Sequence, residues 1–348
     1  MSTGPTTPLA GFRVGGRDGK RYELIAPLGR GGFGEVWEAI DHHEDAEVAV
    51  KFLDPAVTPD RVLLEASLQR RLSAHRRIVS IRTVDIGASP TSYVVQDLHR
   101  AGSLDDVLKT RRPTVRESVR WMQDVLEALA HAHAENVLHL DVKPTNLLLG
   151  PDGHALLTDF GVAEDSIRRA GSASEMYGLT LPPEFYAMPT GIYSDIWLTG
   201  VFGWQLLVGV RPELVAAHTG GLLLPHRYSP DVPIALSRAI SGALEVTPTD
   251  RPASAERMLE AVCKVPIHCG WQEVTPADIG VLRRWEADEG GDGVILEIRE
   301  RRSDFLVTAK AQPGHRLHAR RRSAQATRAG AEQQARAWLT QAVGGTPL

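Results

Sequence analysis

Apolar and polar residues are spaced as in β-strands over much of the segment between residues 22 and 53. Residues 22–28 and 35–40 are short strand-like runs on either side of a glycine-rich turn at 29–34, and residues 47–53 alternate apolar side chains with others. Residues 1–20 are instead rich in Gly, Pro, Ser and Thr, so we expect a flexible N-terminus. The pattern predicts a sheet that begins near residue 21.

Helical spacing appears next. Residues 59–73 carry an apolar stripe, and two further strand-like runs follow at 81–86 and 93–98. After this point helices are expected at 104–109 and 115–135, with Ser103 and Thr114 as their N-caps. A strand-rich first third followed by a helix-rich stretch predicts an α+β protein of two lobes. The crevice between such lobes is where ligands usually bind.

The pattern changes again near residue 265. Residues 265–275 show little periodicity and are expected to link a large domain at 21–264 to a small one at 276–341. The order expected in this appendage is α-β-β-β-α, with a helix at 276–289, strands at 294–300, 305–311 and 316–322, and a closing helix at 327–339.

Composition narrows the setting of this chain of 348 residues. A hydrophobic content of 43%, a charged content of 24% and a net charge of −4 are ordinary for a soluble globular protein. The longest apolar run, 196–210, is shorter than the roughly 20 residues that span a membrane. Cys263 and Cys269 do not form a CxxC pair or a disulfide framework. We expect a cytoplasmic protein without a membrane partner.

The glycine-rich turn has the spacing GxGxxGxV when it is read from Gly29 to Val36. Alone this signal is weak, because a tight hairpin also uses glycines for positive φ. The turn joins two strands, however, whereas a dinucleotide fingerprint joins a strand to a helix. Such a flap would let backbone N–H groups approach phosphate oxygens. Lys51, on the next strand, would present a cation to those phosphates if Glu65 on the following helix held it in place.

The strongest signal lies at residues 137–149, where polar residues interrupt a nearly continuous apolar run. Asp141 could accept a hydrogen bond from an attacking hydroxyl, and Lys143 could stabilise charge on a transferred group. Asn146 could coordinate a metal, and Asp159, which begins an Asp-Phe-Gly sequence, offers a second oxygen ligand. Two such ligands suit Mg²⁺ bridging phosphates.

Taken together, these motifs resemble the eukaryotic-type protein kinase family, which is also found in bacteria as serine/threonine kinases. The similarity covers about residues 22–263. Further landmarks occur in order: Pro183-Glu184 resembles the end of the activation segment, residues 194–197 the start of the buried central helix, and Arg251 the partner of that glutamate. The resemblance implies a two-lobed kinase fold with a β-rich N-terminal lobe, a helical C-terminal lobe and the small α/β appendage.

The resemblance also implies roles for individual residues. Asp141 would be the catalytic base, Lys143 a contact of the γ-phosphate, Lys51 with Glu65 the clamp on the α- and β-phosphates, and Asn146 and Asp159 the ligands of Mg²⁺ or alternatively Mn²⁺. ATP would be bound by Leu28, Gly29, Gly31, Gly34, Val36, Ala49, Lys51, Gln96, Asp97, Leu98 and Leu148. Lys143, two residues after Asp141, is typical of the serine/threonine class. The implied reaction is transfer of the γ-phosphate of ATP to Ser or Thr of protein substrates, with autophosphorylation.

Three positions depart from the family pattern. Leu140 replaces the arginine that usually reads a phosphate on the activation segment, so we expect activation without that contact. The stretch 174–184 is irregular, with Tyr177 where a substrate-loop threonine is expected unless Thr180 takes its place. Gln69 stands at a usually apolar position and is expected to make its helix easier to displace. A nucleotide-binding pseudokinase acting as a scaffold is the alternative reading, although such proteins usually lose one of the catalytic residues present here.

The appendage is rich in arginine. Between Arg299 and Arg336 ten basic residues stand against three acidic ones, a balance of +7. The expected order of elements is that of a double-stranded-RNA-binding domain, which reads shape and phosphate. The favoured interpretation is a solvated face of a domain that packs on the kinase or binds an acidic protein, and a nucleic-acid partner is the alternative. Substrate recruitment or control of the kinase would be its role by analogy.

Overall fold

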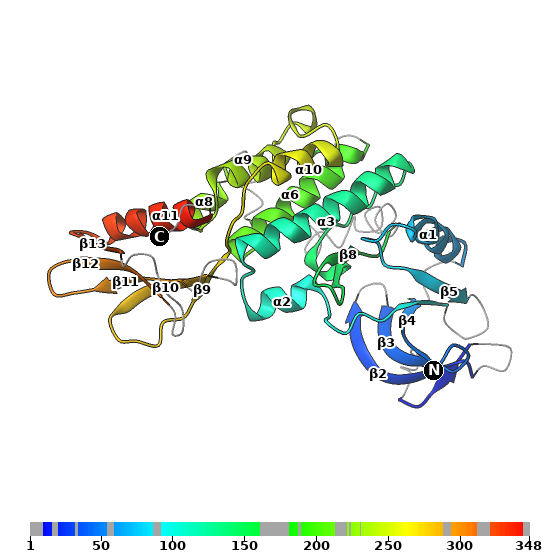
Figure 1. Ribbon diagram of the computed structural model, residues 1–348. Coiled ribbons are helices and arrows are strands. Elements are labelled where there is room, and N and C mark those ends of the chain that lie inside the picture. Colours follow the sequence, from blue (N-terminus) through cyan, green and yellow to red (C-terminus); the bar gives the residue numbers. More distant parts are fainter. Residues whose placement is uncertain are drawn as a thin grey trace, which may run out of the picture.

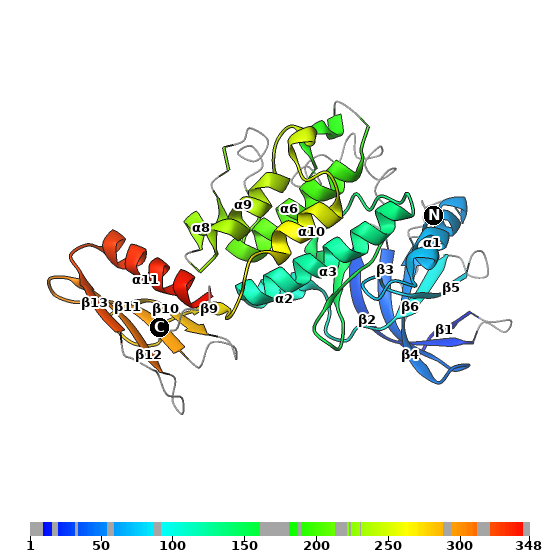
Figure 2. The same cartoon turned by 45° about the horizontal axis from the view of Figure 1, so that its top comes forward.

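The computed structural model describes residues 10–15, 20–31, 34–53, 59–85, 92–160, 181–186, 189–212, 221–222, 224–229, 231–287, 294–311 and 321–343. Two sheets lie at opposite ends of an elongated molecule, with a helical layer between them (Figures 1 and 2). Among the helices that the structure describes, none combines the length and apolar character needed to cross a membrane.

The N-terminal sheet is antiparallel, in the order β1-β2-β3-β4-β6-β5. Its strands are β1 (Arg13–Val14), β2 (Tyr22–Gly31), β3 (Gly34–Asp41), β4 (Ala46–Leu53), β5 (Ile81–Asp85) and β6 (Tyr93–Asp97), and α1 (Pro59–Leu72) accompanies them. Alternation decides which side chains fill its core: Trp37 and Ala39 of β3 are buried together with Val48 and Val50 of β4. The strands and helix predicted for this region are confirmed to within a few residues.

The helical layer follows a short connection after β6. It consists of α2 (Leu104–Thr110), α3 (Val115–Ala134), α6 (Ile192–Val208), α8 (Pro225–Tyr228), α9 (Ile234–Ala243) and α10 (Ala255–Cys263), with the hairpin β7 (Leu147–Leu149) and β8 (Ala155–Leu157) and the 3-10 turns η1 (Pro144–Asn146), η2 (Pro183–Tyr186) and η3 (Pro248–Asp250). Ser103 and Thr114 are confirmed as N-caps, and each forms a reciprocal capping box with the residue three positions later. Helix α6 is buried from Ser194 to Leu207, so it forms the centre of this layer.

The C-terminal unit, residues 271–343, is a five-stranded antiparallel meander with one helix on one face (Figures 1 and 2). Its strands β9 (Trp271–Val274), β10 (Val281–Ala287), β11 (Val294–Glu300), β12 (Phe305–Ala311) and β13 (Arg321–Gln325) precede α11 (Arg328–Val343). The predicted strands at 294–300 and 305–311 and the closing helix are confirmed. Of the strand predicted at 316–322, residues 316–320 lie outside the described part of the chain.

Two predictions for this unit are wrong. The helix predicted at 276–289 is wrong, because Val281–Ala287 is a central strand paired with both β9 and β11. Trp285 and Ala287 alternate with Arg284 and Glu286, so one face enters the core while the other forms an ion pair. Part of the predicted linker, Trp271–Val274, is the edge strand β9. The order is therefore β-β-β-β-β-α, which removes the similarity to a double-stranded-RNA-binding domain.

Candidate active site

The loop at residues 137–146 enters the site from α3 and is fixed by a buried carboxylate of α6. Asp195, fully buried, accepts hydrogen bonds from the backbone N–H of His139 at 2.9 Å and of Leu140 at 2.6 Å. His133 Nε2 lies 2.8 Å from the same carboxylate. Leu140 has a φ of +59°, a costly conformation for leucine, and these hydrogen bonds stabilise it. The sequence placed Asp195 only at the start of a helix and missed this anchoring role.

His139 connects the loop to the end of β8. Its Nδ1 accepts a hydrogen bond from the N–H of Asp141 at 3.2 Å, so Nε2 carries the proton and donates to the carbonyl of Thr158 at 2.9 Å. The ring also packs edge-on against Phe160, with 4.7 Å between centroids. Asp141 and Asp159 are thus positioned through one imidazole.

Asp141 is the centre of a small polar cluster with the two residues predicted beside it. Asn146 donates its amide nitrogen to the Asp141 carboxylate at 2.8 Å and to the Asp141 carbonyl at 2.9 Å. Lys143 Nζ lies 2.7 Å from the same carboxylate oxygen, Oδ2. Because the Asn146 nitrogen is directed to Asp141, its oxygen Oδ1 is the atom that it can offer to a cation.

Lys51 and Asp159, which are 108 positions apart, meet across the two lobes. Lys51 Nζ lies 2.6 Å from Asp159 Oδ1, and Asp159 has a φ of +65°. Helix α1 carries Glu65, but its side chain lies outside the described residues, as does any pairing with Lys51. Gln69 on the same helix is buried and donates to the carbonyl of Val79 at 3.1 Å. Its amide therefore ties α1 to the connector that precedes β5, and the expectation of an easily displaced helix stays untested.

The residues predicted to surround ATP come from neighbouring strands. Val36 pairs with Gly29 and with Lys51, and Ala49 pairs with Gln96. Leu28 is half exposed, Gln96 is buried and Asp97 forms an ion pair with Arg82. An isolated β-bridge joins Leu148 to Ser103, five residues after Leu98. Gly29, Val36, Ala49, Lys51 and Gln96 therefore lie on adjoining strands of one sheet.

Gly34 shows why the turn requires glycine. Its φ is +133°, and a Cβ atom there would lie 1.8 Å from the carbonyl oxygen of Phe52. Gly31 pairs with Gly34 at the end of the hairpin. The next two residues of the loop, 32–33, lie outside the described part, as do residues 161–180 with Tyr177 and Thr180.

Glu184 and Arg251 form a bidentate ion pair with two 2.8 Å hydrogen bonds, and both side chains are almost fully buried. Arg251 also lies over the ring of Trp197, 4.8 Å from its centroid. Burial alone would raise the pKa of Glu184, but the hydrogen bonds from Arg251 and the backbone outweigh it and lower that pKa. The pair predicted from the sequence is therefore present.

Comparisons with known proteins agree with this arrangement. Residues 22–220, more than half of the chain, match the family model described as protein kinase domain. The chain is 30% identical over 264 residues to the serine/threonine-protein kinase PknA of Mycobacterium tuberculosis, an alignment that covers 70% of this chain and 60% of that protein. It is 29% identical over 286 residues to PknK of the same species, which covers 76% of this chain and 25% of that protein.

A third relative is the probable serine/threonine-protein kinase pknA2 of Bifidobacterium longum, 25% identical over 278 residues. That alignment covers 72% of this chain and 36% of the relative. The chain thus spans 60%, 25% and 36% of the lengths of these three curated proteins, less than two thirds of each. The family model and the order of motifs at the site nevertheless agree with one another. The chain belongs to the protein kinase family.

Proposed function

We propose that this chain is a serine/threonine protein kinase that transfers the γ-phosphate of ATP to protein hydroxyls, including its own. The observation that carries the proposal is the cluster of Asp141, Lys143 and Asn146 beside the Lys51–Asp159 pair. The three bacterial relatives bear names of serine/threonine kinases, which supports the same class. Lys143 favours Ser or Thr over Tyr as the acceptor.

The donor set at this cluster fits a divalent cation. Asn146 and Asp159 offer an amide and a carboxylate oxygen, and the N–H of Thr158 donates to the Asn146 carbonyl at 3.1 Å, which holds the two positions together. The Asp159 carboxylate already binds one positive charge, because Lys51 Nζ lies 2.6 Å from its Oδ1. Mg²⁺ prefers oxygen ligands and keeps waters and substrate phosphates in its shell, so two protein ligands suffice. When bound, it would neutralise phosphate charge during transfer.

In the proposed reaction, Asp141 accepts the proton of the substrate hydroxyl and orients it toward the γ-phosphate. Lys143, 2.7 Å from that carboxylate, stabilises charge on the transferred group. Lys51 contacts the α- and β-phosphates, and the backbone of Gly29, Gly31 and Gly34 covers them. The adenine contacts assigned to Leu28, Val36, Ala49, Gln96, Asp97, Leu98 and Leu148 belong to the same proposal.

The test is to incubate the purified chain with Mg²⁺, labelled ATP and a generic protein substrate, and to identify the modified residues by mass spectrometry. We expect phosphoserine and phosphothreonine, both in the substrate and in the chain itself. Nucleotide binding without any label transfer, under Mg²⁺ or Mn²⁺, would instead support the pseudokinase scaffold.

For the C-terminal unit, which we take to begin near residue 271, we propose a role in recruiting protein substrates or controlling the kinase. Arg336 of α11 donates to the carbonyl of His226 on α8, and Arg116 of α3 donates to the carbonyl of His268. Ile267 packs against the cores of both parts. These contacts favour a unit that is docked on the helical layer.

The basic side chains of this unit do not favour a nucleic-acid partner. Arg283, Arg284, Arg299, Arg301, Lys310 and Arg328 each have a carboxylate within 4.0 Å, so their charge is largely paired. A gel-shift titration with duplex RNA at several salt concentrations tests this reading. Salt-dependent binding lost in an Arg321→Ser, Arg322→Ser variant would restore the nucleic-acid interpretation.

A further inference from the structure

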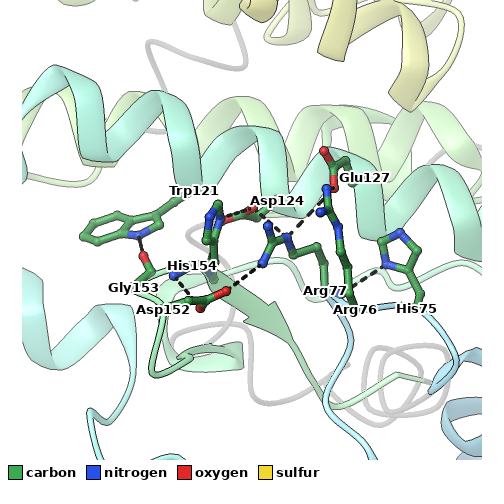
Figure 3. Close-up of polar contacts among 10 residues, drawn as sticks. His75, Arg76, Arg77, Trp121, Asp124, Glu127, Asp152, Gly153 and His154 are labelled. Atoms are coloured by element: carbon green, nitrogen blue, oxygen red, sulfur yellow. Dashed lines mark hydrogen bonds and ion pairs between the residues drawn. The ribbon is translucent and has the colours of Figure 1, made fainter.

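A buried carboxylate on α3 lies outside the catalytic cluster and has no role in the reaction proposed above. Asp124 is only 3% exposed, in the middle of a helix whose neighbouring residues are mostly apolar core. Figure 3 shows that it faces two basic side chains: Arg77 Nε lies 2.9 Å from Oδ1, and His154 Nδ1 lies 2.8 Å from the same oxygen. The N–H of Ala155 donates to Oδ2 at 2.9 Å.

These contacts join three segments that are distant in the sequence. Arg77 belongs to the connector between α1 and β5 (residues 73–80), Asp124 to α3, and His154 and Ala155 to the β7–β8 hairpin. The connector is also paired with β8 through its backbone, because Leu157 donates to the carbonyl of Arg77 at 2.8 Å and Val79 donates to the carbonyl of Leu157 at 3.0 Å. Asp124 therefore lies where both lobes meet the hairpin.

The hairpin is held at its closed end and carries the two candidate metal ligands at its open end. Trp121, one turn before Asp124, donates its indole N–H to the carbonyl of Gly153 in the turn at 3.0 Å (Figure 3). At the other end Asn146 directly precedes β7, and Asp159 follows β8 after one residue. A tilt of this short hairpin at its closed end would move Asn146 and Asp159 relative to Lys51.

The link between Asp124 and Arg77 is an ion pair between buried side chains. The side chains of Arg77 and Asp124 are 7% and 3% exposed, and burying such a pair costs about as much as the pair returns. Stability alone therefore does not account for the arrangement. A charged carboxylate can hold two segments at once, which an apolar contact cannot: it attracts the Arg77 guanidinium of the connector by charge and is hydrogen-bonded by His154 and the N–H of Ala155 in the hairpin.

We propose that Asp124 and Arg77 are positioning residues that set the metal-binding end of the β7–β8 hairpin, an inference that rests on the kinase function proposed above. The pair acts through Asp159 and Asn146 and does not touch nucleotide. Loss of groups that hydrogen-bond directly to metal ligands costs about 10- to 100-fold in metal affinity or activity, and because this pair acts at one remove we expect an effect at the 10-fold end of that range. The expected effect is thus a loss of metal-dependent nucleotide binding rather than of nucleotide binding as such.

The neighbouring arginine provides a matched control. Arg76 forms a 2.9 Å ion pair with Glu127 that links the same connector to the same helix (Figure 3), but its side chain is 68% exposed. Exposed pairs of this kind contribute little. Arg76→Gln and Arg77→Gln are the same chemical change at adjacent positions. They differ in burial and in partners, because Arg77 also has Asp124 and Asp152 within 4.0 Å.

The experiment measures the affinity of the full-length chain for a non-hydrolysable ATP analogue by calorimetry, with Mg²⁺ and with EDTA. In Asp124→Asn and Arg77→Gln we expect the gain in affinity that Mg²⁺ gives the wild type to fall by about 10-fold, with affinity in EDTA unchanged. Arg76→Gln should match the wild type, and Arg77→Lys should recover part of the loss. His154→Gln, at a half-buried position, is a milder variant that keeps the test open if Asp124→Asn does not fold.

Three results would overturn the proposal. Folded variants with an unchanged Mg²⁺ effect would show that the pair positions nothing. Equal losses with and without Mg²⁺, or the same loss in Arg76→Gln, would indicate general destabilisation. Because binding is read without phosphotransfer, a wild type that binds the analogue with Mg²⁺ but transfers no phosphate would fail the proposed function and leave this result interpretable.

Discussion

Replacing Arg251 with methionine tests the anchoring of the segment that ends at Glu184. The substitution keeps much of the side-chain volume and removes the charge. It deletes both 2.8 Å hydrogen bonds to Glu184 and those to the backbone carbonyls of Glu245, Tyr193 and Val246. Glu184 would remain buried with Ser194, whose hydroxyl donates at 3.0 Å, as its other side-chain hydrogen bond.

The size of the expected loss in free energy of unfolding follows from the burial of both Arg251 and Glu184. Breaking a buried ion pair by removing one side costs about 3–5 kcal/mol, because the remaining charge keeps its desolvation penalty. Glu184→Gln should cost less, about 2 kcal/mol, because Arg251 keeps its carbonyl acceptors. The double variant should be less destabilised than the two single effects combined, with a coupling free energy of about 2 kcal/mol.

Urea denaturation followed by tryptophan fluorescence measures these free energies of unfolding, since Trp197 lies directly under Arg251. The stability that the Glu184–Arg251 pair contributes depends on pH with a definite sign. The folded pKa of Glu184 is lowered, so its stabilisation is present above the unfolded pKa and is lost as pH falls through the folded pKa. The gap between wild type and Arg251→Met should therefore narrow below about pH 4.5. Strictly additive single effects, or a gap that widens in acid, would refute the reasoning.

Further predictions concern catalysis, regulation and helix stability. Lys51→Met should lower the phosphotransfer rate by about 10²-fold or more, as loss of a preorganised charge contact does; steady-state kinetics with a circular dichroism control checks this. Thr114→Ala should cost about 1 kcal/mol in chemical denaturation, because it removes one half of the capping box of α3. Activity should stay within a few-fold of wild type, in a radiometric assay, when alanine replaces Ser166, Ser172 and Ser174, the serines between the Asp-Phe-Gly sequence and Tyr177. The reason is that Leu140 has no charge with which to bind a phosphate.

Local signals in the sequence predicted most of the kinase part. The capping boxes at Ser103 and Thr114 depend on residues three positions apart. The polar residues at 141–146 interrupt an apolar run, which indicates a chemical role for them. The role of Asp195 could not be read in this way, because it depends on two N–H groups that arrive from a loop more than 50 positions earlier.

The C-terminal unit shows the opposite case. The stretch around Trp285 is charged and helix-compatible by composition, and only pairing with strands on both sides makes it a strand. Tertiary context overrode local preference there. Arg77 and Asp124 were missed for a related reason: a charged residue in a connector and another in a helix are ordinary in sequence, and only the fold brings them together.

The most direct test of the central claim is single-turnover phosphotransfer by wild type and Asp141→Asn, with nucleotide affinity measured in parallel. If Asp141 is the catalytic base, the variant should bind Mg²⁺ and ATP with similar affinity and transfer phosphate about 10²- to 10⁴-fold more slowly. Transfer by Asp141→Asn at the wild-type rate would contradict the assignment of the active site.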